Sequence, residues 1–303
     1  GVQKKFKVSM RDLAGLSAKD DPLDDLRVLL ERYGNWIATL KERRRTDKEL
    51  VEASITDKII DKIEHVEKRV VDGFSLIENG PEDVRKAFQL ANQAMYIAQT
   101  RGKFDTRLPQ WKGESNRKGT WVFDSPYVDY DSNSDDGKTG FWRPFQIAFL
   151  LMSLKGLADP TNVEREEVDL IWFPTGGGKT EAYLGVIAFL LFLLRIRGDD
   201  SGGVKVLMRY TLRLLTAQQF ERAATLFCSM EYIRKRRHDL GSQPFTIGLW
   251  VGSATSPNTR ETAKNALSAL KKNQKSNPFI LRRCPWCAAK YGPVVKKWDE
   301  ALA

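Results

Sequence analysis

The sequence is poor in cysteine and histidine and has no long apolar run, and each shortage limits what the chain can be. It contains three cysteines and two histidines among 303 residues, too few for a disulfide framework. We recognise no secretory signal. The most apolar run, residues 182–196, is shorter than the roughly 18 residues that a membrane span requires. We therefore expect a cytoplasmic protein with no membrane partner.

What the chain does have is an excess of positive charge on an otherwise ordinary composition. Hydrophobic residues make up 42% and charged residues 29% of the sequence, which is typical of a soluble globular protein. The length allows two domains and a sizeable core. The formal net charge of +10 favours a polyanionic partner such as nucleic acid.

The N-terminal third is predicted to be a helical module over residues 1–102. Apolar residues recur at helical spacing in residues 22–45 and 56–78. Asn79-Gly80-Pro81 then ends the second helix, because glycine suits a helix C-terminus and proline a first turn. A third helix is predicted over residues 81–100. We expect a structural or partner-binding module and assign it no chemistry.

Residues 103–140 are predicted to form a connecting loop rich in aromatic and acidic side chains. One interpretation is a solvated connector. The other is autoinhibition, in which the acidic stretch 123–138 occupies a nucleic-acid groove and competes with the ligand. Both interpretations remain open at this point.

A glycine-rich loop between an apolar run and an apolar helix pattern is the strongest chemical signal. Its sequence is Phe173-Pro174-Thr175-Gly176-Gly177-Gly178-Lys179-Thr180. Residues 168–173 are predicted to be a buried parallel strand and a helix begins near Lys179, which is the context of a phosphate-binding P-loop. Glycines let backbone N–H groups approach the β-phosphate closely. Lys179 would reach the β- and γ-phosphates of ATP, and Thr180 would ligate Mg²⁺.

The loop departs from the usual pattern at its first position, where Phe173 replaces a small residue. The phosphate-cradling part, residues 175–180, is intact, so we still expect nucleotide binding. The alternative is a glycine-rich turn in which Gly-Lys-Thr occurs by chance.

Two further stretches could contact ligands. Gln146, in Arg143-Pro144-Phe145-Gln146, lies where helicase-like motors place an adenine-reading glutamine, although a polar helix start is the alternative. A second strand is predicted at residues 204–208 and leads into a helix with candidate phosphate donors. A third strand is predicted at residues 245–251 and is followed by two small residues that could approach a phosphate. These candidate nucleic-acid contacts are Arg209, Thr211, Arg213, Gln218, Gly252 and Ser253. An ordinary helix start and a plain turn are the alternatives.

Cys284-Pro285-Trp286-Cys287 is predicted to be half of a zinc site that begins near residue 278. Two cysteines three positions apart can chelate one metal ion, but tetrahedral zinc needs two more ligands. Cys228 lies alone in a predicted helix, and neither His65 nor His238 has zinc-site spacing. The remaining ligands are therefore expected outside this sequence. A redox pair and two ordinary thiols are the alternatives.

These motifs together resemble superfamily 2 helicases, and more narrowly the helicase family of the bacterial DISARM anti-phage systems. The resemblance covers about residues 141–287 and implies a DNA-dependent ATPase with a protein partner subunit. It implies an α/β fold over residues 141–303, a first RecA-like P-loop NTPase domain with a parallel sheet and flanking helices. The implied cofactor-binding residues are Arg143, Gln146, Thr175, Gly176, Gly177, Gly178, Lys179, Thr180 and Glu181, of which Lys179 and Thr180 are catalytic.

The chain is expected to be incomplete as a helicase and inactive alone. Hydrolysis needs an Asp-Glu pair on a later strand and arginine fingers from a second domain. Asp299-Glu300 is the one candidate pair, and the segment before it, residues 294–298, is too charged for a buried strand. Two rival functions remain: another P-loop ATPase, and a non-catalytic nucleic-acid-binding scaffold with a vestigial P-loop.

Overall fold

The structure, a computed structural model, describes most of the chain and divides it into two compact units. The described residues are 6–46, 53–113, 119–131, 136–174, 177–199, 201–210, 213–252, 256–272 and 278–291. The first unit comprises Gly1–Tyr96, Ser132–Val206 and Ile233–Gln243, and the second comprises Ile97–Asp131, Leu207–Tyr232 and Pro244–Ala303.

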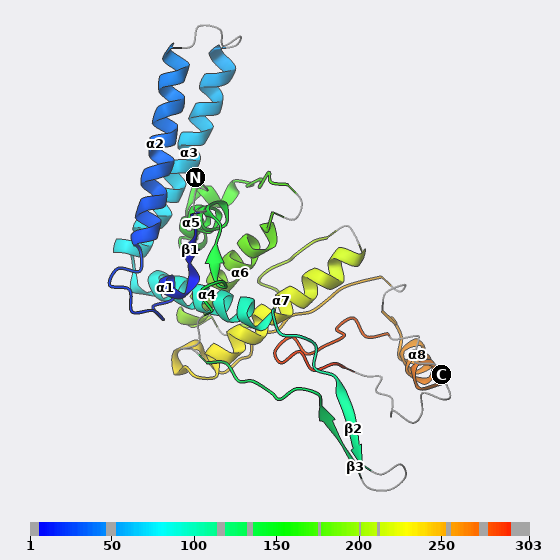
Figure 1. Cartoon of the computed structure of the whole chain (residues 1–303). Coiled ribbons are helices and arrows are strands. Elements are labelled where there is room, and N and C mark those ends of the chain that lie inside the picture. The colour runs from blue at the N-terminus through cyan, green and yellow to red at the C-terminus, as the bar shows by residue number, and fades with distance from the viewer. Residues whose placement is uncertain are drawn as a thin grey trace. The chain divides into compact units, whose positions relative to one another are not determined.

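A pair of long helices dominates the first unit. Helices α2 (Asp24–Thr46) and α3 (Ala53–Asn79) run side by side in opposite directions (Figure 1). The N–H of Gly80 donates to the carbonyl of Leu76 at 3.1 Å, and α4 (Glu82–Arg101) begins two residues later. The three predicted helices are therefore confirmed, with the predicted break between the second and the third.

The rest of the first unit consists of short elements and two buried helices. Its further elements are β1 (Val8–Ser9), α1 (Met10–Leu13), β4 (Phe141–Trp142), α5 (Pro144–Ala158), the 3₁₀ helix η1 (Val163–Glu166), α6 (Lys179–Ile196) and the 3₁₀ helix η2 (His238–Leu240). Strands β1 and β4 pair antiparallel. Helix α5 packs against α3 on one side and α6 on the other.

Helix α6 contains the apolar run of residues 182–196, which is apolar nearly all round because the helix is largely buried. Phe189, Phe192 and Leu193 have almost no exposed surface. No described helix combines the length and the apolarity that crossing a bilayer requires.

The second unit contains a β-hairpin and two further helices. Strands β2 (Pro109–Gly113) and β3 (Gly119–Phe123) pair antiparallel, with Trp111 opposite Trp121. This hairpin lies within the region predicted as a connecting loop. Most of α7 (Arg213–Arg234) and all of α8 (Arg260–Lys272) belong to this unit. The helix predicted after residues 204–208 is confirmed by α7.

The predicted α/β fold with a RecA-like parallel sheet is wrong for the described residues. They are mostly helical, and their only sheets are the two antiparallel pairs β1–β4 and β2–β3. The segments 168–173, 204–208 and 245–251, predicted as strands, have no strand structure. Several of their apolar side chains face solvent: Val168 is 97%, Trp172 90% and Trp250 98% exposed, whereas Phe245 is buried.

The error has a physical origin. An apolar run identifies a segment that would gain from burial, but a strand exists only where a neighbouring strand accepts and donates its backbone hydrogen bonds. Within the described part of the chain, none of these three segments pairs with a neighbour.

Candidate nucleotide-binding loop

The glycine loop lies in the first unit between two buried helices whose positions are fixed by Trp142. The indole of this strand β4 residue is completely buried, and its Nε1 donates to Oδ1 of Asn92 on α4 at 2.7 Å. Gly185 of α6 lies against the same ring, because a Cβ at that position would be 2.7 Å from Cη2. One tryptophan therefore holds α4, the start of α5 and α6 together.

Helix α6 begins directly after the glycines, as the P-loop pattern predicts. Gly178 is its N-cap, with a left-handed φ of +88° that favours glycine. A Cβ there would be 2.7 Å from Nε2 of Gln146 and 3.3 Å from Oε2 of Glu181. The first N–H groups of a helix have no intrahelical acceptor and attract anions. Lys179 and Thr180 form the first turn of α6. Thr175 and Gly176 lie outside the described residues.

Two side chains from the start of α5 hold the loop. Arg143 Nη1 donates to the carbonyl of Gly177 at 2.6 Å, and Gln146 Nε2 donates to the carbonyl of Gly178 at 2.7 Å. Gln146 Oε1 accepts the Arg143 backbone N–H at 2.8 Å in a capping box. The buried amide of Gln146 thus uses both ends on the protein itself. Its reading of adenine stays a prediction, which would rest on the second N–H and the second lone pair of the amide.

Lys179 also interacts with the loop. Its Nζ donates to the carbonyl of Phe173 at 2.5 Å and reaches that of Pro174 at 3.4 Å. The ring of Phe173 stacks on Phe145 with centroids 4.0 Å apart, which shows how the bulky first residue of the motif is accommodated. A phosphate would fit this donor set, which combines helix N–H groups, one ammonium and the Thr180 hydroxyl. Lys179 would exchange carbonyl oxygens for phosphate oxygens.

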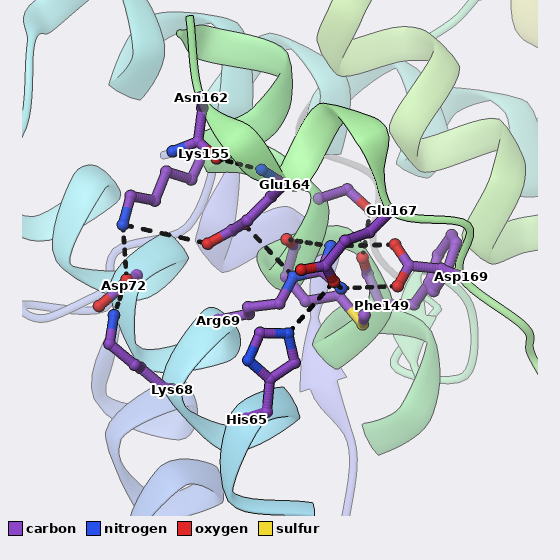
Figure 2. Close-up of polar contacts among 12 residues, drawn as sticks. His65, Lys68, Arg69, Asp72, Phe149, Lys155, Asn162, Glu164, Glu167 and Asp169 are labelled. Carbon is purple, nitrogen blue, oxygen red and sulfur yellow. Dashed lines mark hydrogen bonds and ion pairs between the residues drawn. The ribbon is translucent and has the colours of Figure 1, made fainter. Parts of the chain in front are cut away.

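A buried arginine anchors the segment that leads into the loop (Figure 2). Arg69 of α3 has a side chain only 5% exposed. Its guanidinium binds Asp169 through two contacts, Nη1 to Oδ1 at 2.6 Å and Nη2 to Oδ2 at 3.0 Å. It also donates to Glu167 at 3.2 Å and to Glu164 of η1 at 3.3 Å. The hydrogen bond to Asp169 raises the pKa of Arg69 above its ordinary value, so the cation is permanent.

A second set of charges continues the cluster along α3. Asp72 Oδ2 accepts from Lys155 of α5 and from Lys68, both at 2.7 Å. These two hydrogen bonds lower the pKa of Asp72 below its ordinary value. His65 Nε2 lies 3.2 Å from Oε2 of Glu167. Helices α3 and α5 and the segment before the glycine loop are therefore tied by charge as well as by apolar packing (Figure 2). Except for Lys68 and Asp72, which lie four residues apart on α3, the partners are 83 or more residues apart, so no local pattern in the sequence indicates them.

The candidate nucleic-acid contacts all belong to the second unit, which does not contain the glycine loop. Arg209, Gln218 and Gly252 are exposed, and Gln218 lies on α7. Arg213 is the first residue of α7, but its side chain is not described. Thr211 and Ser253 lie outside the described residues. Their roles stay predictions. Asp299 and Glu300 also lie outside the described residues.

The cysteine pair lies in the second unit as well. Burial alone would raise the pKa of Cys284, but hydrogen bonds from the backbone N–H groups of Cys287 and Trp286 and from the Tyr291 hydroxyl bring it below its ordinary value. Cys228 of α7 interacts electrostatically with both cysteines of the pair, and burial raises its pKa to about 11. No local pattern predicts that this third cysteine lies near the pair, because it precedes Cys284 by more than fifty residues.

These observations define a class: a protein that is mostly helical in its described residues, with glycines directly before a buried helix that begins at Lys179. No family model matches the chain. It is 32% identical over 306 residues to the DISARM protein DrmA of Bacillus paralicheniformis, an alignment that covers 96% of this chain. The resemblance drawn from the motifs is thereby confirmed. The alignment spans 25% of that relative, so the chain corresponds to about a quarter of its length.

Proposed function

We propose that this chain is the nucleotide-binding part of a DISARM anti-phage defence protein that uses ATP to translocate along or unwind DNA. The observation that carries the proposal is the junction at Gly178. A left-handed glycine there starts an 18-residue helix whose first turn contains Lys179 and Thr180. The similarity to DrmA supports a defence role, and a protein partner and a cytoplasmic location belong to the same proposal.

The contacts of the loop suggest how nucleotide binding would proceed. In the structure, Lys179 donates to two loop carbonyls, while Arg143 and Gln146 each donate to one. A triphosphate brings oxygens with more negative charge than a carbonyl, so the lysine would move to the phosphates. Arg143 would then either keep its hydrogen bond to the loop or join Lys179 at the phosphates. Mg²⁺ would be held by the Thr180 hydroxyl and the phosphates.

The test is ATP turnover by the full-length protein that contains this chain, measured with and without single-stranded DNA. Lys179→Ala is the informative variant. Lys62→Ala is its matched control, because Lys62 is an exposed lysine of α3 far along the sequence from the loop. We expect turnover that rises with DNA in the wild type and in Lys62→Ala. In Lys179→Ala turnover should fall at least a hundredfold, about 3 kcal/mol of transition-state stabilisation.

The other outcomes separate the rival functions. Lysine-dependent turnover that is indifferent to DNA would identify another kind of P-loop ATPase. DNA binding without turnover, unchanged in Lys179→Ala, would identify a binding scaffold with a vestigial loop. Either outcome would contradict the proposal.

A further inference from the structure

The second unit contains a short hairpin whose turn includes both cysteines of the pair. Its arms are joined by an antiparallel bridge between Arg283 and Lys290 and by a bond from the Tyr291 N–H to the Arg282 carbonyl at 2.9 Å. The turn between them is Cys284-Pro285-Trp286-Cys287 followed by Ala288. The Cys284 N–H donates to the Ala289 carbonyl at 2.8 Å and closes the turn at its base.

The backbone of this turn is tightly closed. The Ala288 N–H donates to the Cys284 carbonyl at 2.9 Å, so both cysteines belong to a single hydrogen-bonded turn. Ala288 then has a φ of +56°, the only left-handed non-glycine residue in the described part of the chain. Such a conformation costs about 1 kcal/mol or more for a residue with a Cβ.

The turn is also rigidly supported. The Trp286 ring stacks on Tyr232 at 5.0 Å, and the Arg101 guanidinium carbon lies 4.3 Å from its centroid. The indole Nε1 of Trp286 donates to the Tyr127 hydroxyl at 3.0 Å. The Arg107 N–H donates to the Ala288 carbonyl, and the Lys290 N–H donates to the Arg107 carbonyl, both at 2.9 Å. A pair of sulfurs fixed in this way loses little freedom when it binds a metal.

We propose that Cys284 and Cys287 are two of the four ligands of a structural zinc ion, and that the other two ligands come from outside these 303 residues. The pair alone supplies only two of the four ligands. Apart from it, the sequence contains one cysteine, Cys228, and two histidines, His65 and His238. Within the parts of the chain that the structure describes, no three His, Cys, Asp or Glu side chains form a group that could hold a metal ion.

Cys228 is assigned a structural role and not that of a ligand. It lies on α7 close enough to the pair to interact electrostatically, yet it forms no metal-binding group with it. It is therefore the matched control, a cysteine in the same environment that should not contribute to metal binding. The proposal does not depend on the nucleotide-binding function, and either can fail without the other.

The test is the zinc content of the full-length protein, measured by mass spectrometry of the metal after expression with added zinc. We expect Cys284→Ser and Cys287→Ser each to contain one zinc ion fewer per chain than the wild type, and Cys228→Ser to match it. Cys287→His guards against misfolding, because a histidine can replace a thiolate ligand. In this variant zinc should be retained, and after substitution with cobalt its thiolate-to-metal absorption should be weaker than in the wild type.

Three results would overturn the assignment. The first is an unchanged zinc content in both serine variants. The second is an equal loss in Cys228→Ser, which would make the site a cluster of three thiols. The third is a Cys284–Cys287 disulfide in the protein as purified, which would assign the pair to redox chemistry.

Discussion

Replacing Arg69 tests whether the buried charge cluster holds the approach to the glycine loop. Arg69→Met removes the guanidinium while keeping most of the aliphatic volume. The change leaves Asp169, Glu167 and Glu164 without their shared cation. Breaking a buried ion pair by removing one partner costs about 3–5 kcal/mol. Because Asp169 is 25% and Glu167 39% exposed, water can rehydrate them, and we expect the lower end, about 3 kcal/mol.

Urea unfolding followed by far-UV circular dichroism measures this loss. The matched control is Arg43→Met, which changes an exposed arginine of α2 and should alter the free energy of unfolding by no more than about 0.5 kcal/mol. A double-mutant cycle with Asp169→Asn should give a coupling of about 1–3 kcal/mol. If Arg69→Met costs less than about 1 kcal/mol, or if the two changes are additive, the cluster does not hold this segment and the reasoning is refuted.

Two further predictions concern the loop and the pH dependence of stability. Gly178→Ala and Gly198→Ala both place a Cβ at a positive φ, but only the first meets an obstacle, Gln146 Nε2 at 2.7 Å. Both variants should lose about 1–2 kcal/mol of the free energy of unfolding because of backbone strain. Titration with fluorescent ATP should show weaker binding in Gly178→Ala alone, and equal binding in both variants would disprove the close approach. Asp72, whose pKa is lowered from 3.8 by its hydrogen bonds to Lys155 and Lys68, stabilises the fold fully above pH 3.8 and loses this contribution as the pH falls below that value. Asp72→Asn should therefore lower the free energy of unfolding by about 0.5–1 kcal/mol at pH 6. The difference in urea midpoint between this variant and the wild type should shrink toward pH 3, and a difference that persists there would contradict the assignment.

The helices could be predicted from sequence because their signals are local. The periodicity of α2 and α3, the break at Gly80 and the start of α6 at Lys179 all depend on residues a few positions apart. The close contact between the loop and Gln146 was not foreseen, because that residue was interpreted either as a partner for adenine or as a polar helix start. The contact depends on how α5 packs beside α6, which no local pattern specifies.

The strand predictions were wrong for a related reason. The stretches around Trp172 and Trp250 have the composition of buried strands, but pairing depends on a neighbour that composition does not supply. Arg69 and Asp169 were missed because charged residues on a predicted helix and a predicted strand indicate exposure more often than burial. In the structure they meet across a hundred residues, and only the fold brings them together.

The exposure of Trp172 gives the protein an intrinsic optical reporter. Its indole is 90% exposed and lies one residue before Phe173, whereas the indole of Trp142 is completely shielded. Light emitted by Trp172 should therefore be red-shifted and easily quenched by acrylamide, while that from Trp142 should not. Any molecule or polypeptide segment that covers the approach to the glycine loop will change the first signal and spare the second. Because Trp250 is 98% exposed and would emit in the same way, occupancy of this region can be followed without a label once Trp250 and the other exposed tryptophans are replaced by phenylalanine.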